Sequence, residues 1–253
     1  MPEKRHVLVL GGTGEAVKLA DRAASDWRVT YSLAGRTQAP SLPSSVSVRS
    51  GGFGGAEALA AWMSENGISA VIDATHPFAD RIAANAADAS ARTGTPRLKL
   101  VRPAWVRHLD DDWREVPDIA AAASWLAPLG RKIFLSVGRS ELGAFAGIAG
   151  KSFLVRTAEP LTDCPVAGAE IVVERGPFSL AHEVWLMRSH GIDAVVSKNS
   201  GGDATYAKIL AARELGLPVV MVARPLSPAG PAASTIADAL AWLSALPRKE
   251  DPT

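Results

Sequence analysis

The stretch HVLVLGGTGEAVKLADRAA, residues 6–24, decides the fold, because it joins an apolar run to a glycine-rich turn and then to a helical pattern. The apolar run 6–10 predicts a buried strand, and 15–24 has the alanine and leucine spacing of a helix. Glycines between a strand and a helix let a diphosphate approach the backbone N–H groups at the start of the helix. The sequence therefore predicts a dinucleotide site on Gly11, Gly12, Thr13, Gly14 and Glu15. The alternative is a turn that only connects the strand to the helix.

The same alternation of strand and helix continues along the chain and sets the fold class. Apolar runs rich in β-branched residues predict strands, and alanine-rich stretches with helical spacing predict the helices between them. In the first part of the chain the predicted strands are 6–10, 29–33, 46–49, 70–73 and 97–101, and the predicted helices are 15–24, 56–66 and 79–92. Strands that alternate with helices predict a mainly parallel, doubly wound sheet.

A second series of strands and helices follows an interruption after Arg102 and Pro103. The interruption includes the acidic run 110–112, which we expect to be a solvated loop. Beyond it the predicted strands are 132–137, 153–156, 171–174, 194–198 and 219–223, and the predicted helices are 179–190, 204–215 and 232–246. We therefore predict an α/β protein of two Rossmann-like doubly wound domains, 1–102 and 103–253, with an active-site cleft between them.

Composition and charge exclude several classes of protein. The 253 residues contain 27 Lys and Arg against 26 Asp and Glu, so no global charge favours nucleic acid or an anionic membrane surface. No export signal is visible, and no apolar stretch approaches the roughly 20 residues that cross a bilayer. Cys164 is the one cysteine, which excludes an internal disulfide and a cysteine-based zinc site. We expect a cytoplasmic protein without nucleic-acid or membrane partners and without a metal.

Arg36 and Thr37 indicate which dinucleotide the turn would bind. Arg36 lies 22 residues after Gly14, where an NAD-binding chain carries an acid for the ribose hydroxyl. A guanidinium can instead bind a 2′-phosphate with two hydrogen bonds, and the Thr37 hydroxyl can add a donor, so we expect NADPH. A solvated surface arginine is the alternative. A second glycine cluster, GGFGG at residues 51–55, follows the third predicted strand. It would place Gly52 and Phe53 on the adenosine side of the site, and the alternative is a flexible connection.

The loop DATHPFA, residues 73–79, follows the fourth predicted strand and would face the nicotinamide end of the cofactor. Ligands of open α/β sheets bind at the carboxyl ends of strands, which is where this loop starts. The expected cofactor contacts in it are Asp73, Thr75, His76 and Pro77. His76 precedes a proline, which keeps the histidine extended and outside the following helix. His76 would donate a proton to the reaction, and the alternative is a structural or exposed histidine.

Several segments together resemble the precorrin-6x reductase family of cobalamin biosynthesis over nearly the whole chain. They are GGTGE (11–15), DATHPFA (73–79), LVRP (100–103), SVGR (136–139), GPF (176–178) and KNSGG (198–202), and their order and spacing make the resemblance specific. The resemblance implies an NADPH-dependent oxidoreductase that reduces one double bond of the precorrin-6A macrocycle to give precorrin-6B, without metal or flavin. It also implies that 1–102 binds NADPH and that 103–253 binds the precorrin. A cobalt-containing counterpart serves the related anaerobic pathway, and the sequence does not separate the two.

The implied substrate is a tetrapyrrole with many carboxylates, so a near-neutral protein must gather cations at one place. Cations follow several predicted strands, which fits such a polyanion. The expected substrate contacts are Phe78, Arg102, Arg139, Ser140, Arg156, Lys198, Ser200, Gly201 and Gly202, and Arg175 and Arg224 belong to the same set of strand-end cations. The turn 200–202 would offer backbone N–H groups at the start of a helix. Some of the cations will instead cap helices or pair with neighbouring acids. Other enzymes of the pathway are candidate partners.

Two residues, His76 and Lys198, are candidates for catalysis. An imine-like conjugated system that is protonated on nitrogen can accept hydride, and the proton could come from either residue or from solvent. Two other functions stay open: an NADPH reductase of another cyclic imine, of the dihydrodipicolinate type, and a nucleotide-sensing module without chemistry. The cations of the second half distinguish them, because a bare sensor would not require Arg139, Arg156 and Lys198.

Overall fold

The computed structural model describes residues 4–35 and 40–247, which divide into two compact units. The first unit consists of two segments of the chain, one that ends at Arg102 and one that begins at Leu226. The second unit runs from Pro103 to Pro225. The expected junction after residue 102 coincides with this division. The predicted second domain, 103–253, is wrong for residues 226–247, which belong to the first unit. Within the described part of the chain, no helix combines the length and apolar character needed to cross a membrane.

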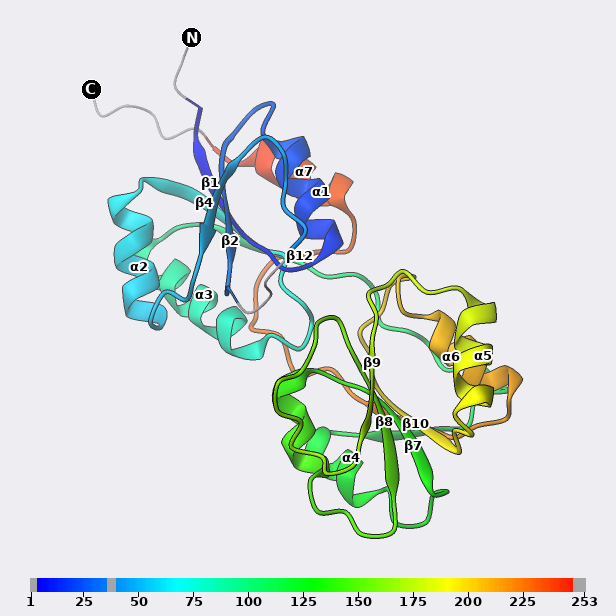
Figure 1. Cartoon of the computed structure of the whole chain (residues 1–253). Coiled ribbons are helices and arrows are strands. Elements are labelled where there is room, and N and C mark those ends of the chain that lie inside the picture. The colour runs from blue at the N-terminus through cyan, green and yellow to red at the C-terminus, as the bar shows by residue number, and fades with distance from the viewer. Residues whose placement is uncertain (1–3, 36–39, 248–253) are drawn as a thin grey trace, which may run out of the picture. The chain divides into compact units, whose positions relative to one another are not determined.

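The first unit contains a six-stranded sheet in which every pairing is parallel. Its strands are β1 (His6–Leu10), β2 (Arg28–Leu33), β3 (Ser47–Ser50), β4 (Ile68–Asp73), β5 (Arg97–Leu100) and β12 (Ala232–Ala233), in the order β12-β5-β4-β1-β2-β3. Helices α1 (Gly14–Ala23) and α7 (Ile236–Ala245) cover one face, and α2 (Ala56–Glu65) and α3 (Asp80–Thr93) cover the other, as Figure 1 shows. This is the doubly wound arrangement that the sequence predicts.

Strand β1 lies at the centre of the first unit, and all five of its residues are buried. Val7 and Val9 belong to the core that contains residues of α1 and α7, whereas Leu8 and Leu10 belong to the core that contains residues of α2 and α3. A parallel strand covered on both faces needs apolar residues at successive positions. The uninterrupted apolar run at the start of the chain therefore has a structural cause.

The second unit repeats this topology in a second parallel sheet. Its strands are β6 (Trp113–Val116), β7 (Lys132–Ser136), β8 (Ser152–Thr157), β9 (Glu170–Val173), β10 (Ala194–Lys198) and β11 (Val219–Val222), in the order β6-β11-β10-β7-β8-β9. Its helices are α4 (Ile119–Ser124), the 3-10 helix η1 (Arg139–Phe145), α5 (Leu180–Ser189) and α6 (Ala207–Glu214). Figure 1 shows α4 on one side of this sheet and α5 and α6 on the other. Strands β7 to β11 are arranged as β1 to β5 are, so the repeat lies in the topology.

The end of the chain completes the first sheet. Strand β12 pairs with β5, and α7 packs against α1. The hydroxyl of Thr235 accepts a hydrogen bond from the Asp238 N–H at 3.1 Å and caps α7, so the helix predicted over 232–246 begins only at Ile236. In the second sheet, the corresponding edge position beside β11 is filled by β6, which precedes β7 in the chain and was not predicted.

The acidic run before β6 holds a buried carboxylate, that of Asp111, where the sequence predicts a solvated loop. The carboxylate accepts hydrogen bonds from the Arg213 guanidinium at 2.8 Å and 3.2 Å and from the His108 N–H at 2.7 Å. Burial by itself raises the pKa of a carboxyl, but the bonds from Arg213 and His108 outweigh it and lower the pKa of Asp111. The expectation of a solvated run is therefore wrong at this position, because Asp111 fastens the run to α6.

Asp111→Asn is expected to lower the free energy of unfolding by about 2 kcal/mol, because it removes the carboxylate that faces the partly buried Arg213 guanidinium. Urea unfolding at neutral pH measures the change. Asp110→Asn is the matched control at an exposed neighbour, where we expect no more than about 0.5 kcal/mol. The lowered pKa means that Asp111 stabilises the fold at neutral pH and that this contribution is lost as the pH falls through the folded-state pKa. Equal losses in both variants would contradict the prediction.

The buried side chain of His6 makes the first unit sensitive to acid. Its Nδ1–H donates to the carbonyl of Asn66 at 2.9 Å, and its Nε2 accepts from the Thr30 hydroxyl at 2.8 Å, which fits a neutral ring. Burial lowers the pKa of His6 below its ordinary value of 6.5, against the bond to Asn66, which raises it.

The free energy of unfolding is therefore expected to fall as the pH drops below 6.5, since the unfolded chain then binds a proton that the folded chain excludes. His6→Gln should make this pH dependence shallower, and urea unfolding at a series of pH values measures it. An unchanged slope in the variant would assign the acid sensitivity to other groups.

Candidate functional site

The carboxyl ends of β1 and β4 form the place in the first unit where a ligand is expected. These strands are neighbours, and the connections that leave them run to opposite sides of the sheet, which defines the switch point of a doubly wound fold. Strand β1 leads into the turn 11–14 and α1, and β4 leads into the loop 74–79. The fold therefore brings together the two segments that were predicted from sequence to contact the cofactor.

Thr13 ties these two segments to each other. Its hydroxyl accepts a hydrogen bond from the Ala16 N–H at 3.1 Å, as the N-cap of α1, and donates to the carbonyl of Ala74 at 2.9 Å. The start of α1 is thus fixed against the end of β4. Backbone N–H groups in the first turn of a helix, together with the helix dipole, favour an anion at that point.

Two glycines of the turn have different roles. A side chain at Gly11 would collide with the ring of Tyr31, whose hydroxyl accepts the Gly12 N–H at 3.0 Å. Burial raises the pKa of Tyr31, which keeps this hydroxyl protonated. Gly12 has a φ of 111°, and no atom outside Gly12 and its two chain neighbours lies within 4 Å of the point where its Cβ would be. The turn fits a diphosphate, because the backbone at Gly12 is open to close approach.

Val17 stands where the usual dinucleotide fingerprint has its third glycine, a position that governs the packing of the helix on the strand. Its side chain is partly buried and packs against the core of the first unit. The departure from the fingerprint therefore concerns the buried side of α1 and leaves the open face of the turn unchanged.

Asp73 is wholly buried and acts within the protein. Its carboxylate accepts hydrogen bonds from the Lys99 ammonium at 2.9 Å and from the Thr75 hydroxyl at 2.6 Å. The expected contact of Asp73 with the cofactor is corrected to a supporting role, because a carboxylate without exposed surface holds Thr75 in place and does not reach a ligand. Sequence reasoning missed Lys99, although a lysine between two leucines of a predicted strand was a signal for it.

A pocket at these strand ends collects residues that lie far apart in the sequence. Its lining is Thr13, Glu15, Ala74, Thr75, Pro77, Leu100, Val101, Arg102, Ser234 and Ile236. The Arg102 guanidinium lies 3.0 Å from the Glu15 carboxylate, so the structure places Arg102 beside the predicted cofactor turn. Ser234 and Ile236 were missed, because their position depends on the pairing of β12 with β5.

His76 and Phe78 follow Thr75 in the same loop. The Nδ1 of His76 accepts the Phe78 N–H at 3.3 Å, and the two rings lie 5.8 Å apart. Because Nδ1 accepts, the proton of the neutral ring lies on Nε2. The histidine is therefore oriented by its own loop, with a donor on the other side of the ring.

The second glycine cluster of the first unit is braced by Arg49, which sequence reasoning missed. Its guanidinium donates to the carbonyls of Gly51 at 2.5 Å and Gly52 at 2.9 Å and lies 3.7 Å from the centre of the Phe53 ring. These contacts favour a fixed loop over a flexible connection. Arg36 and Thr37, the predicted contacts of the 2′-phosphate, lie outside the described residues.

The second unit has its own switch point, between β7 and β10. Lys198 ends β10, and its ammonium lies 2.8 Å and 3.0 Å from the two carboxylate oxygens of Glu141. Glu141 also accepts the Gly138 N–H at 2.6 Å, and the side chain of Lys198 is 14% exposed. The ammonium is thus held at the strand end. Glu141 was missed, although a glutamate three residues after the N-cap position, here Gly138, is half of the capping-box signal.

Other predicted residues extend along the same edge of the second sheet. Arg139 and Ser140 are exposed at the start of η1, and Arg175 follows β9. Both arginines approach Glu159, at 3.6 Å and 3.5 Å respectively. Because all strands of this sheet are parallel, these groups share its carboxyl edge with Lys198.

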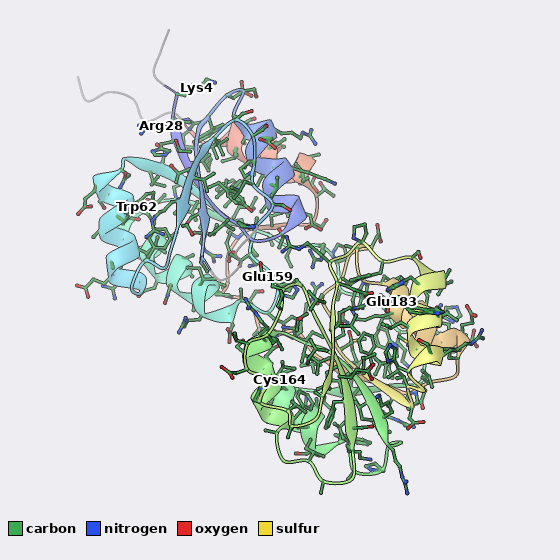
Figure 2. The ribbon with its side chains drawn as sticks, in the orientation of Figure 1. Lys4, Arg28, Trp62, Glu159, Cys164 and Glu183 are labelled. Carbon is green, nitrogen blue, oxygen red and sulfur yellow. The ribbon has the colours of Figure 1, made fainter. Side chains whose placement is uncertain are left out.

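Arg156 has an internal role in the second unit. Its guanidinium lies 2.8 Å from the carboxylate of Glu183, which has no exposed surface, and 3.8 Å from the centre of the Phe178 ring. Figure 2 shows Glu183 on the helical layer beside the sheet. The expected contact of Arg156 with substrate is corrected to a structural one, because its charge is matched within the core.

The turn from Ser200 to Gly202 is held by residues from distant parts of the second unit. Arg224 donates to the carbonyl of Ser200 at 2.9 Å, and the Trp105 indole N–H donates to the carbonyl of Gly202 at 2.8 Å. Helix α6 begins only at Ala207, so the expectation that this turn opens a helix is wrong. Arg224 fixes the turn through the backbone.

Within the described residues, no group of three or more His, Cys, Asp or Glu side chains is arranged to hold a metal ion.

Comparisons with known proteins agree on one enzyme family. The family model for precorrin-6x reductase CbiJ/CobK matches residues 6–244. A precorrin-6A reductase of Rhodococcus erythropolis is 45% identical over 246 residues, which cover 96% of this chain and 99% of that relative. A cobalt-precorrin-6A reductase of Salmonella typhimurium is 30% identical and covers 87% of each chain. The solved structure of CobK precorrin-6A reductase has a TM-score of 0.89 at 40% identity, covering 95% of this chain and 96% of its own.

Proposed function

The chain belongs to the precorrin-6x reductase family, and we propose that it uses NADPH to reduce one double bond of precorrin-6A, giving precorrin-6B in cobalamin biosynthesis. The observation that carries the proposal is the pair of switch points on one chain. The first presents a glycine turn with an open backbone at Gly12, and the second presents a held lysine, Lys198, with arginines along the same sheet edge. A dinucleotide suits the first site and a polycarboxylate suits the second.

The metal-free macrocycle is the favoured substrate form. Relatives named precorrin-6A reductase are 40 to 46% identical to this chain, whereas relatives named cobalt-precorrin-6A reductase are 27 to 30% identical. Both kinds of relative share most of their length with the chain. The difference in identity supports precorrin-6A over its cobalt complex.

NADPH would be held by residues from three segments of the first unit. The turn 11–14 would receive the diphosphate, Arg36 and Thr37 would receive the 2′-phosphate, and the loop that contains Thr75 and Pro77 would contact the nicotinamide end. The buried pair of Asp73 and Lys99 supports that loop from below. When bound, NADPH supplies the hydride that the reduction requires.

The chain's own groups supply the orientation and the proton. Reduction of the double bond adds a hydride to carbon and a proton to the adjoining atom of the conjugated system. Lys198 would present an ammonium proton to the substrate, with Glu141 fixing its direction through two contacts, at 2.8 Å and 3.0 Å. The Nε2–H of His76 is the second candidate donor, and solvent is the third. Orientation of the macrocycle against the cofactor contributes to the rate as well.

Purified protein mixed with NADPH and precorrin-6A under exclusion of oxygen tests the proposal. We expect NADPH absorbance to fall together with the spectrum of precorrin-6A, in equal amounts, and NADH to serve poorly in its place. Bound NADPH without oxidation would indicate a nucleotide sensor. Oxidation with a cyclic imine such as dihydrodipicolinate, and none with precorrin-6A, would indicate the other reductase.

A further inference from the structure

Three charged side chains meet over β7, β8 and β9 at the carboxyl edge of the second sheet. Arg139 follows β7, Glu159 follows β8 and Arg175 follows β9. Strand β8 lies between the other two, and Glu159 accordingly lies between the two arginines. The guanidinium of Arg139 is 3.6 Å from one of its carboxylate oxygens, and that of Arg175 is 3.5 Å from the other. Figure 2 labels Glu159 at one end of this sheet.

The three groups differ in exposure. The side chain of Glu159 is 12% exposed, whereas those of Arg139 and Arg175 are each 44% exposed. The carboxylate therefore lies beneath the guanidinium groups, and the Thr157 hydroxyl fixes the loop below by donating to the carbonyl of Glu159 at 2.7 Å. Both ion-pair distances exceed the roughly 2.7–2.9 Å of a strong charge-assisted hydrogen bond. Half-exposed pairs of this kind contribute little to folding stability.

We propose that Arg139 and Arg175 together bind one carboxylate arm of the tetrapyrrole. Glu159, which lies beneath the two guanidinium groups, is the positioning residue that holds both of them in place for that carboxylate. The inference rests on the proposed function, since it requires a polycarboxylate substrate. Each guanidinium presents a planar fork that matches a carboxylate, and two forks at one point fix its place on the protein. Arg175 thus takes the substrate-binding role that the sequence suggested for Arg156, whose charge is matched in the core.

The test measures equilibrium binding of precorrin-6A without NADPH, by ultrafiltration and absorbance, so that it does not depend on turnover. Arg139→Met and Arg175→Met are each expected to weaken binding about tenfold, the effect of losing a hydrogen bond between charged groups. If the two arginines share one carboxylate, the double variant will lose far less than the product of the two single effects. Losses that multiply would mean two separate carboxylates and would overturn the shared site.

Arg114→Met is the matched control, because Arg114 is 48% exposed and paired with Asp112 at 3.1 Å, but lies at the amino end of β6. It should leave the affinity unchanged, and single variants of Arg139 and Arg175 that bind as tightly as this control would refute the site. Glu159→Ala is expected to weaken binding severalfold in the unmodified protein and to add no further loss to the double-arginine variant. A further loss there would show that Glu159 acts other than through the arginines.

Failure of the carboxylate site can be distinguished from failure of the proposed reductase function. Protein that binds precorrin-6A through this pair but oxidises no NADPH would retain the carboxylate site and refute the reductase. If the protein reduces precorrin-6A and every variant binds precorrin-6A as tightly as the Arg114→Met control does, the reductase proposal stands and the carboxylate site is refuted.

Discussion

Lys198→Met is expected to lower kcat/KM for precorrin-6A between about a hundredfold and about ten-thousandfold, the range for loss of a positioned proton donor. The ammonium of Lys198 lies at the switch point of the second sheet and is held by both carboxylate oxygens of Glu141. Methionine keeps the length of the side chain and removes its charge and its protons. Glu141 keeps its bond from the Gly138 N–H at 2.6 Å, so the local fold should persist. Steady-state rates of NADPH oxidation measure the effect.

Lys132→Met is the matched control for Lys198. The Lys132 ammonium also pairs with a glutamate, Glu170, at 2.9 Å, but it stands at the first residue of β7, at the opposite edge of the sheet. We expect its kcat/KM to stay within about twofold of the unmodified protein, as surface pairs contribute little. In Lys198→Met the fall should appear in kcat. A rise in KM with kcat unchanged would assign Lys198 to binding and would leave His76 or solvent as the proton donor.

The strands other than β6 and β12, and the first switch point, could be predicted because each rests on a local pattern. Strands β1 and β10 have the bounds expected from their apolar runs, and the glycine turn stands between strand and helix as its composition indicates. The parallel sheets followed from the alternation of strand with helix, and the order of strands then placed the two motifs of the first unit together.

The contacts that organise the charges could not be predicted, because they join residues distant in sequence. Glu141 meets Lys198 across 57 residues, and this requires that β10 lie beside β7. In the sequence, Arg156 resembled the other cations at strand ends that were expected to bind substrate. Its partner Glu183, however, lies on the buried side of α5. Periodicity shows which residues are buried in an element, but it does not show which buried acid faces which cation.

The return of the chain to the first sheet was missed for a related reason. Residues 232–246 are apolar enough to predict one helix, and only the pairing of β12 with β5 shows that the segment begins as a strand. Edge strands as short as two residues carry almost no pattern of their own. Ser234 and Ile236 reach the pocket of the first unit as a consequence of that pairing.

Gly12→Val is expected to weaken NADPH binding about a hundredfold, equivalent to roughly 2.7 kcal/mol. Gly12 has a φ of 111°, which a β-branched residue adopts only with strain, and its Cβ would enter the open space where the diphosphate is expected. By contrast, a side chain at Gly11 would meet the buried Tyr31 ring and test the core instead of the ligand site. Fluorescence titration with NADPH measures the affinity, and urea unfolding of the same sample measures the cost to the fold.

Gly94→Val is the control that separates the effect of backbone strain from the loss of the NADPH site at Gly12. Gly94 ends α3 in the left-handed conformation, with a φ of 64° and no atom beyond its chain neighbours within 4 Å of its Cβ position. It does not line the pocket of the first unit. Both variants should lose a similar free energy of unfolding, about 1–3 kcal/mol for a strained backbone. Only Gly12→Val should lose affinity for NADPH. If Gly94→Val loses as much affinity, the effect at Gly12 comes from destabilisation of the unit; if neither loses affinity, the diphosphate does not lie on this turn.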